Sequence, residues 1–340
     1  MRYGIAARVE DKSLDVAQAV VHRVFDWLPR VEAYTGLGTP TRVRVLCRTL
    51  LSPGERHRHQ ARPTSRGFRS YLCLPADEEQ VRLAVGGRTL TTVTDRAGYI
   101  DQEVDLLEPL TPGWHSVHFT AVRSGAMARG ALLVVDPAAT IGLISDIDDT
   151  AMVTAVPQLA LAVWNTFIEK TTSRKPVIGM PDFLNSIVAD YPNAPVVYLS
   201  NGAWNTARAL RRFLKRFNFP AGPLLLTDFG PTDTGLFRSG KAHKRSQIKW
   251  LMEAFPHIGW VLVGDDGQSD PAIYAEAAQL YPSRVAAIAI RTLTPVQRMV
   301  WLAGTRPAPL GATTADDVPV IAGPNGDALL AEFRALNLIF

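Results

Sequence analysis

The chain has 340 residues, of which 47% are hydrophobic, 20% charged and 8% aromatic, a globular balance whose length suggests two domains. The formal net charge of +4 is only weak evidence for anionic partners. The sequence lacks both an apolar run long enough for a helical membrane span and a signal-peptide core near its start. We therefore expect a soluble, cytoplasmic protein, with peripheral contact at a membrane surface left open.

The first 138 residues contain two different hydrophobic patterns. Apolar residues recur at helical spacing from 14 to 29, so we expect an N-terminal helical segment within residues 1–35. Residues 36–138 hold short β-branched runs separated by Gly, Pro and Asp, which predicts an antiparallel β-sandwich-like domain. The two cysteines, Cys47 and Cys73, lie in these runs and are expected to be buried free thiols rather than a disulfide.

The pattern changes again over residues 139–310. Short, mostly apolar runs end there in polar or glycine-rich turns and alternate with helix-like segments. This alternation predicts an α/β domain, in which a parallel sheet is covered by helices on both faces. The tail, residues 311–340, begins as a loop and ends in one amphipathic helix. Ligands bind beyond the carboxyl ends of the strands in such sheets, so the residues after each apolar run are candidate site residues.

The first of these strand ends carries two carboxylates, Asp146 and Asp148, in the segment ISDIDDT. Alternate residues of an extended segment point the same way, so both side chains could face one pocket. Close carboxylates repel each other unless a cation intervenes, and Mg²⁺ bound by carboxylates and phosphate oxygens fits that need. A carboxylate can also attack phosphorus. The alternative is an acidic turn that caps a helix; Asp149 is expected to be structural and Thr150 to brace the loop through its hydroxyl.

Two further strand ends carry groups that could bind an anion. Ser200-Asn201-Gly202 ends an apolar run just before a helix, where a hydroxyl and backbone N–H groups can form a phosphate seat. A plain N-cap is the alternative. Lys244 opens a later helix and could pair with a phosphate, whereas a solvated basic helix end is the other interpretation, and Lys241 is its rival.

The fourth strand end is the most acidic, because Asp265, Asp266 and Asp270 crowd the loop that follows a very apolar run. So many acids require a cation or dense hydrogen bonding. We favour metal binding for Asp265. For Asp270 a role as N-cap before Pro271 is as well supported as metal binding, and the role of Asp266 is left open.

The order of these motifs is specific: Asp-x-Asp-x-Thr, then Ser-Asn after a strand, then Lys, then Gly-Asp-x-x-x-x-Asp. Over residues 143–292 it resembles haloacid-dehalogenase-type phosphatases. The closer resemblance is to the catalytic domain of actin-patch-protein-type phosphatidate phosphatases, carried by SDIDDT, YLSNGAWN, HKRSQIKWLMEAFP and GDDGQSDPAIY. It implies a haloacid-dehalogenase-like Rossmannoid sheet. The insert at about residues 154–190 is expected to form a small cap that leaves the pocket open.

The resemblance also implies a role for each motif residue, with Mg²⁺ as cofactor. The implied catalytic residues are the nucleophile Asp146, the general acid/base Asp148, and Ser200 and Lys244 on the phosphate. The implied substrate-binding residues are Ser200, Asn201, Gly202 and Lys244, and the implied metal ligands are Asp146, Asp148 and Asp265. The chain departs from the family at Gly202-Ala203, where Ser-Pro is usual, and at Asp266, where Ser is usual. These departures bear on substrate fit more than on the chemistry.

The expected function is therefore a Mg²⁺-dependent phosphatase that acts through an aspartyl-phosphate, on phosphatidate or a related lipid phosphate. Two basic segments, the helix around Arg208–Arg216 and the loop at 55–66, fit a substrate at an anionic surface, and a solvated face is the alternative interpretation of the helix. The alternatives are a phosphatase of the same fold for a soluble or protein phosphate, and a catalytically inactive phosphate-binding scaffold. Nucleic acid is not an expected partner.

Overall fold

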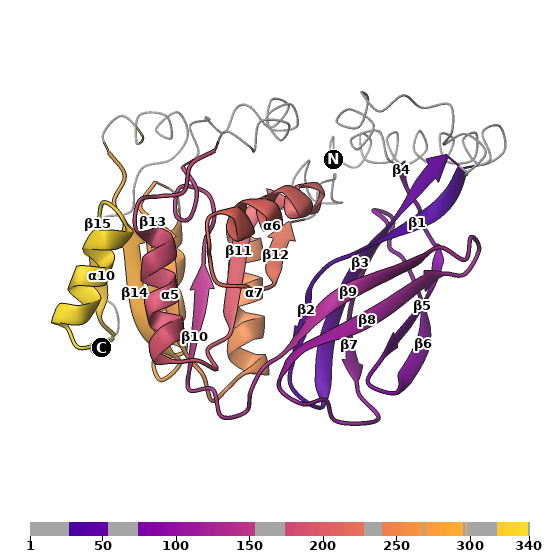
Figure 1. The fold of residues 1–340 in the computed structure, drawn as a ribbon, viewed down its shortest axis with the longest axis horizontal. Helices are drawn as coiled ribbons and strands as arrows, with labels where there is room; N and C mark the ends of the chain where they lie inside the picture. The colour runs from indigo at the N-terminus through magenta and orange to yellow at the C-terminus, as the bar shows by residue number, and fades with distance from the viewer. Residues whose placement is uncertain are drawn as a thin grey trace, which may run out of the picture. The chain divides into compact units, whose positions relative to one another are not determined.

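A computed structural model describes residues 27–53, 74–153, 174–227, 240–267, 269–294, 297 and 318–338. These residues form two compact units, one up to Asp136 and the other from Pro137 onward. The first unit is built of strands alone, and the second alternates strands with helices (Figure 1). The fold is therefore mixed, with a mostly antiparallel sheet in one unit and a parallel sheet in the other.

Within the described residues, the first unit contains one hydrogen-bonded sheet of nine strands. They are β1 (Trp27–Ala33), β2 (Gly36–Gly38), β3 (Arg42–Pro53), β4 (Leu74–Pro75), β5 (Gln80–Val85), β6 (Arg88–Val93), β7 (Tyr99–Asp105), β8 (Gly113–Ala121) and β9 (Met127–Val134). The order is β1-β3-β2-β9-β8-β5-β6, and β4 and β7 also pair with β3. The pairs are antiparallel except for β2 with β9. Alternate residues of these strands, such as Val81 and Leu83 on β5, share one buried core.

The N-terminal helical segment predicted for residues 1–35 is wrong for its last part. Trp27–Ala33 is strand β1, which pairs antiparallel with β3 from Trp27 opposite Pro53 to Ala33 opposite Cys47. Pro29 and Val31 are buried while their neighbours are less so, which is the period of a strand with one covered face. The rest of the predicted helix, up to residue 26, lies outside the described residues, as do the basic loop at 55–66 and Cys73. Cys47 is a buried free thiol, as predicted.

The second unit is a six-stranded parallel sheet among the described residues. Its order is β12 (Leu224–Thr227), β11 (Val196–Ala203), β10 (Ile141–Ser145), β13 (Gly259–Asp265), β14 (Val285–Arg291) and β15 (Val320–Gly323). The central strands are buried on both faces, which explains why their sequences are continuous apolar runs rather than alternating ones.

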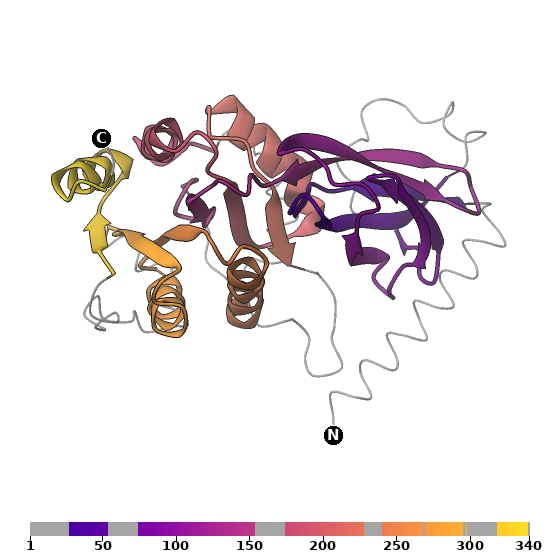
Figure 2. The same ribbon diagram turned by 90° about the horizontal axis from the view of Figure 1, so that it is seen from below.

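Helices cover both faces of this parallel sheet, as the sequence predicted. Figure 2 shows α5 (Met180–Asp190), α6 (Ala207–Arg216) and α10 (Gly326–Ala335) on one face, and α7 (Gly240–Ala254) and α8 (Asp270–Leu280) on the other. The short helix η4 (Trp204–Thr206) connects β11 to α6. None of the described helices is long and apolar enough to cross a bilayer.

Two segments of this unit differ from the prediction. The cap was expected to extend to residue 190, but residues 180–190 form α5, which packs on the sheet because Phe183, Leu184 and Ile187 make one buried face. Residues 154–173, the middle of the expected cap, lie outside the described residues. The tail contains the predicted helix, α10, and also β15, which the sequence analysis missed although it extends the sheet beside β14.

Candidate active site

The carboxyl ends of three neighbouring strands bring the predicted residues together. β10 lies between β11 and β13, so Asp146, Ser200 and Asp265 stand at the same edge of the sheet. The backbone N–H of Asp146 donates to the Val263 carbonyl across a distance of 2.8 Å, which fixes the start of the Asp146 loop on the neighbouring strand. Asp146 is 2% exposed, so the site is a buried one and not an open acidic turn.

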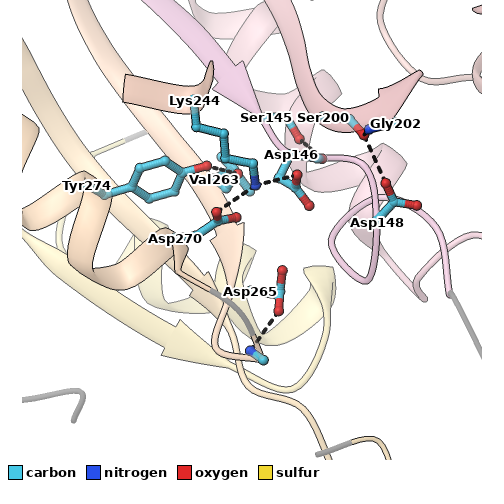
Figure 3. A network of polar contacts seen from close by, with 11 residues as sticks. Ser145, Asp146, Asp148, Ser200, Gly202, Lys244, Val263, Asp265, Asp270 and Tyr274 are labelled. Atoms are coloured by element: carbon cyan, nitrogen blue, oxygen red, sulfur yellow. Dashed lines mark hydrogen bonds and ion pairs between the residues drawn. The ribbon is translucent and has the colours of Figure 1, made fainter. Parts of the chain in front are cut away.

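Lys244, in the second turn of α7, stands among the carboxylates (Figure 3). Its Nζ atom donates to Asp146 Oδ1 at 2.7 Å and to Asp270 Oδ1 at 2.6 Å, and the side chain is 1% exposed. Burial alone would lower the pKa of Lys244, but the Asp146 and Asp270 charges outweigh it and hold the pKa above its ordinary value. Lys241, the rival on the same helix, is exposed. The buried cation of this site is therefore Lys244.

Three buried carboxylates form a cluster around this lysine. Asp146, Asp265 and Asp270 each offer one oxygen within 4.8 Å of the others, a grouping that suits a metal ion. One oxygen of each carboxylate, the Oδ2 atom, is buried without a hydrogen-bond partner in the described part of the chain. Asp265 Oδ1 accepts from the Gly267 N–H at 2.7 Å. The three Oδ2 atoms are the groups that a cation would satisfy.

The electrostatics of the cluster lead to the same conclusion. Burial raises the pKa of Asp146 to about 8; the Lys244 ammonium opposes this rise, and the Asp270 and Asp148 charges add to it. Burial, followed by the Asp270 and Asp146 charges, raises the pKa of Asp265 well above its ordinary value. Carboxyl groups in this state take up either protons or a cation, because each alternative removes their mutual repulsion.

Asp148 does not join this cluster, although the sequence predicted that it would share a metal with Asp146. Its Oδ2 atom accepts from Ser200 Oγ at 2.9 Å, and its side chain points toward Ser200 (Figure 3). Strict alternation does not extend past Asp146 because strand β10 ends at Ser145; Asp148 then forms an isolated bridge with Met152, and the chain turns at Asp149, whose φ is 58°. Asp270 takes the place in the acidic cluster that the sequence analysis gave to Asp148.

The Ser200 segment is a constrained turn at the end of β11. Ser200 Oγ accepts from the Gly202 N–H at 2.8 Å, and the Thr227 hydroxyl donates to the Asn201 carbonyl at 2.9 Å. The Asn201 side chain packs against Gly240 at the start of α7, where a Cβ would lie 2.7 Å from its amide carbon. Ser200 and Lys244 therefore come from elements that contact each other directly beside the site.

Asp270 was the hardest residue to predict, because a capping role explained it equally well. The structure shows that Ser269 is the N-cap of α8 and that Asp270 is the first residue of the helix, turned into the cluster. A Cβ at Gly264 would lie 2.6 Å from Asp270 Oδ2, so glycine on β13 makes room for this carboxylate. The Gly-Asp-x-x-x-x-Asp spacing was the available signal for both residues.

Two arginines beside the site were missed, and one predicted role was wrong. Burial lowers the pKa of Arg174, and the charges of Asp148 and Asp149 oppose this shift. The Arg174 guanidinium therefore lies near both carboxylates. Arg291 donates to the Asp149 carbonyl. Thr150 was expected to brace the loop through its hydroxyl, but this buried Oγ1 has no hydrogen-bond partner among the described residues. Neither arginine lies in one of the four segments from which the sequence analysis drew its candidate site residues.

Comparison with protein families confirms the resemblance over the second unit. Residues 141–292 match the family described as phosphatidate phosphatase APP1, catalytic domain. Phosphatidate phosphatase APP1 of Saccharomyces cerevisiae is 31% identical over 153 residues, which are 44% of this chain and 26% of that protein. An uncharacterized protein of Schizosaccharomyces pombe is also 31% identical, over 152 residues, 44% of this chain and 25% of that protein. The match therefore spans about a quarter of the length of these relatives.

Solved structures give a weaker likeness. The HAD domain of the effector protein Lem4 from Legionella pneumophila is 16% identical, covering 46% of this chain and 88% of that domain, with a TM-score of 0.33. The alignment with a carbohydrate acetylesterase from Xanthomonas citri covers 81% of this chain and 73% of the acetylesterase chain, with a TM-score of 0.27. Scores this low support no conclusion, so the resemblance rests on the family match and on the two yeast proteins.

Proposed function

We propose that the α/β unit is a Mg²⁺-dependent phosphatase of the haloacid-dehalogenase type, acting through an aspartyl-phosphate on phosphatidate or a related lipid phosphate. The observation that carries this proposal is the buried cluster of Asp146, Asp265 and Asp270 around Lys244, in which one oxygen of each carboxylate has no hydrogen-bond partner among the residues that the structure describes. The family match over residues 141–292 supports a phosphoric monoester hydrolase. The division into domains at 36–138 and 139–310 stays a prediction.

The charges of the cluster favour a divalent cation. With all three carboxylates ionised, their three negative charges and the one positive charge of Lys244 leave a net charge of minus two in a buried site, which a divalent cation would balance. Mg²⁺ prefers oxygen ligands and often binds through carboxylates together with substrate phosphate oxygens, so we propose Asp146, Asp265 and Asp270 as the residues that would hold it. When bound, Mg²⁺ would neutralise charge between the anionic nucleophile and the anionic phosphate.

The chain's own residues have separate parts in this scheme. The Asp146 carboxylate attacks phosphorus, forming a new O–P bond as the bond to the leaving oxygen breaks, and Asp148 gives that oxygen its proton. Asp148 then takes a proton from the water that cleaves the aspartyl-phosphate and releases inorganic phosphate. The Ser200 hydroxyl, which now donates to Asp148, would turn to the phosphate, and Lys244 would balance the charge that develops on it.

The lipid substrate rests on the family match and on the charge of α6. Arg208, Arg212, Lys215 and Arg216 are exposed on this helix, which begins just after the Ser200 turn at the carboxyl edge of the sheet. Basic residues near an anionic bilayer contribute about 1 kcal/mol each, so several suffice for transient docking. The alternative of a soluble or protein phosphate is favoured by Gly202-Ala203, which depart from the family beside the proposed phosphate contacts, whereas the presence of Asp146 and Asp148 argues against an inactive scaffold.

Vesicle binding and phosphate release together test the substrate. We expect the protein to sediment at low salt with vesicles that contain phosphatidate and to release phosphate from them. A triple variant with Arg208, Arg212 and Lys215 changed to Glu should lose most of this binding, because each reversal removes about 1 kcal/mol or more. Lys249→Glu is the matched control, since Lys249 is an exposed helical lysine on α7, across the sheet from α6.

The outcomes separate the substrate from the chemistry. If the protein neither binds these vesicles nor hydrolyses their phosphatidate, yet hydrolyses a soluble phosphomonoester, the lipid assignment fails and a phosphatase remains. If no phosphate ester is hydrolysed in the presence of Mg²⁺ although the vesicles are bound, the inactive scaffold is the better account.

A further inference from the structure

Arg291 is a buried cation that the proposed chemistry does not use. It is the last residue of β14, directly beside Asp265 on β13 in the sheet register, and it is 6% exposed. A guanidinium is costly to bury, and a well-packed apolar side chain is often the more stable choice in such a place. The burial of Arg291 therefore requires an explanation, which the acceptors of its hydrogen bonds provide.

Those donors reach three separate segments of the chain. One terminal nitrogen donates to the carbonyl of Asp149, Nε donates to the Pro324 carbonyl at 3.3 Å, and the other terminal nitrogen donates to Gln297 Oε1 at 3.3 Å. Asp149 is the residue with a φ of 58°, at which the chain turns after Asp146 and Asp148. Arg291 thus holds the carbonyl of the left-handed residue that directly follows the Asp146–Asp148 segment.

The backbone around Arg291 is also tied to the Asp265 loop. The N–H of Asp266 donates to the Arg291 carbonyl at 3.1 Å, and Asp266 Oδ1 accepts from the Leu293 N–H at 2.8 Å. Asp266 is one of the positions at which this chain departs from the family that it resembles, and its carboxylate accepts this hydrogen bond in the structure. Arg291 and its neighbours consequently contact both loops that carry the acidic cluster.

We propose that Arg291 is a positioning residue, which fixes the Asp146–Asp148 loop relative to the Asp265 loop through the carbonyl of Asp149. This proposal rests on the proposed phosphatase function. The three nitrogens of the planar guanidinium donate to acceptors in three directions, and the single nitrogen of a lysine ammonium in its place could reach only some of them. Loss of Arg291 leaves the Asp149 carbonyl without this donor, so the turn that directly follows Asp148 becomes more mobile.

The test compares Arg291→Gln with Arg284→Gln. Arg284 is a matched control because it lies just before the opposite end of β14 and also donates to a backbone carbonyl, that of Met252, at 2.6 Å. We expect Arg291→Gln to lower kcat by about 10- to 100-fold, as loss of a residue that orients a ligand does, with KM changed less than about threefold. Arg284→Gln should keep kcat within about twofold even where its Tm falls. Arg291→Lys should recover part of the lost kcat.

A second readout does not depend on activity. Hydrogen exchange without Mg²⁺ should show faster exchange of the amides of residues 147–152 in Arg291→Gln than in Arg284→Gln, at equal global stability. A normal kcat in Arg291→Gln, or equal losses in the two variants, would overturn the proposal. If the wild-type protein is no phosphatase, the proposed function fails by itself, and the exchange rates alone decide: unchanged protection of 147–152 then rejects the positioning role.

Discussion

Lys244 is a charged side chain that lies almost wholly out of solvent, and its two carboxylate partners explain how it can do so. Burial opposes the ammonium form, while Asp146 and Asp270 favour it and hold the pKa of Lys244 above its ordinary value. In turn, the Lys244 ammonium opposes the rise that burial causes in the pKa of Asp146. Lys244 therefore stabilises the acidic cluster, and it is also a candidate contact for phosphate.

Replacement of this lysine should cost stability as well as activity. We expect Lys244→Met to lower the free energy of unfolding by about 3–5 kcal/mol, because buried carboxylates lose their partner. Lys241→Met is the control on the same helix; Lys241 is exposed, so its replacement should stay within about 0.5 kcal/mol. Denaturant unfolding of the two variants measures the difference, and equal effects would mean that Lys244 does not neutralise the cluster.

At the level of residues, sequence reasoning found the strand ends but not every side-chain direction. Asp146, Ser200, Lys244 and Asp265 were identified because apolar runs end in reactive residues at the same edge of a parallel sheet. The presence of Asp270 rather than Asp148 in the acidic cluster was not predictable from spacing. It depends on the end of strand β10 at Ser145 and on the room that Gly264 of strand β13 leaves beside Asp270. Both features depend on the three-dimensional structure, and the hydrophobic periodicity of the sequence does not reveal them.

Among the secondary-structure elements, α5 and α10 show how distant parts of the chain support the sheet. Phe183 of α5 meets Phe333 of α10 edge to face, with ring centroids 4.9 Å apart, and both side chains are fully buried. The N–H of Gly326 donates to the Ile178 carbonyl at 2.8 Å, which ties the start of α10 to the approach to α5. The C-terminal helix is therefore part of the α/β core.

Removal of one ring of this pair should be strongly destabilising. We expect Phe333→Ala to lower the free energy of unfolding of the α/β unit by about 3–5 kcal/mol, because a large buried side chain leaves a cavity. Leu336→Ala is the control just beyond the helix, where the leucine is 51% exposed, and should cost much less. Thermal unfolding of both variants gives the comparison; equal losses would contradict the packing of α10 on α5.

The helices and strands were predictable wherever apolar residues recur with a regular spacing over a long segment. The parallel sheet and its covering helices follow from runs bounded by turns, and α10 follows from its amphipathic spacing. β1 was taken for helix because the apolar residues before it continue at helical spacing, and only its pairing with β3 fixes the strand. β15 is four residues long, too short for periodicity to reveal without its partner β14.

At the scale of the whole molecule, the two units each have a core of their own, and the acidic cluster belongs to only one of them. A ligand that binds the native cluster stabilises the unit that contains it, by about 2.7 kcal/mol when its concentration is 100 times the dissociation constant. In calorimetry we expect Mg²⁺ to raise the transition of the α/β unit and not that of the β unit. Phe119→Ala, in the β core, should identify the second transition by lowering it.

Asp265→Asn is the control for this effect, because it removes a proposed ligand and leaves the bonds of Lys244 intact. The variant should show a much smaller shift with Mg²⁺. A rise of both transitions by the same amount in the wild-type protein would show that the units unfold together, and no rise at all would count against a metal at the cluster.

The central claim is that Asp146 is the nucleophile of a Mg²⁺-dependent phosphatase. Asp146→Asn should fold normally despite its burial, since Asn has nearly the same shape, Lys244 keeps its bond to Asp270, and one buried charge is removed. The most direct test is phosphate release by the wild-type and Asp146→Asn proteins, at equal folded content, with Mg²⁺ and in excess chelator. We predict release by the wild-type protein with Mg²⁺ only, and a rate at least about 1,000-fold lower for Asp146→Asn. Comparable release by Asp146→Asn, or full wild-type activity in excess chelator, would contradict the account.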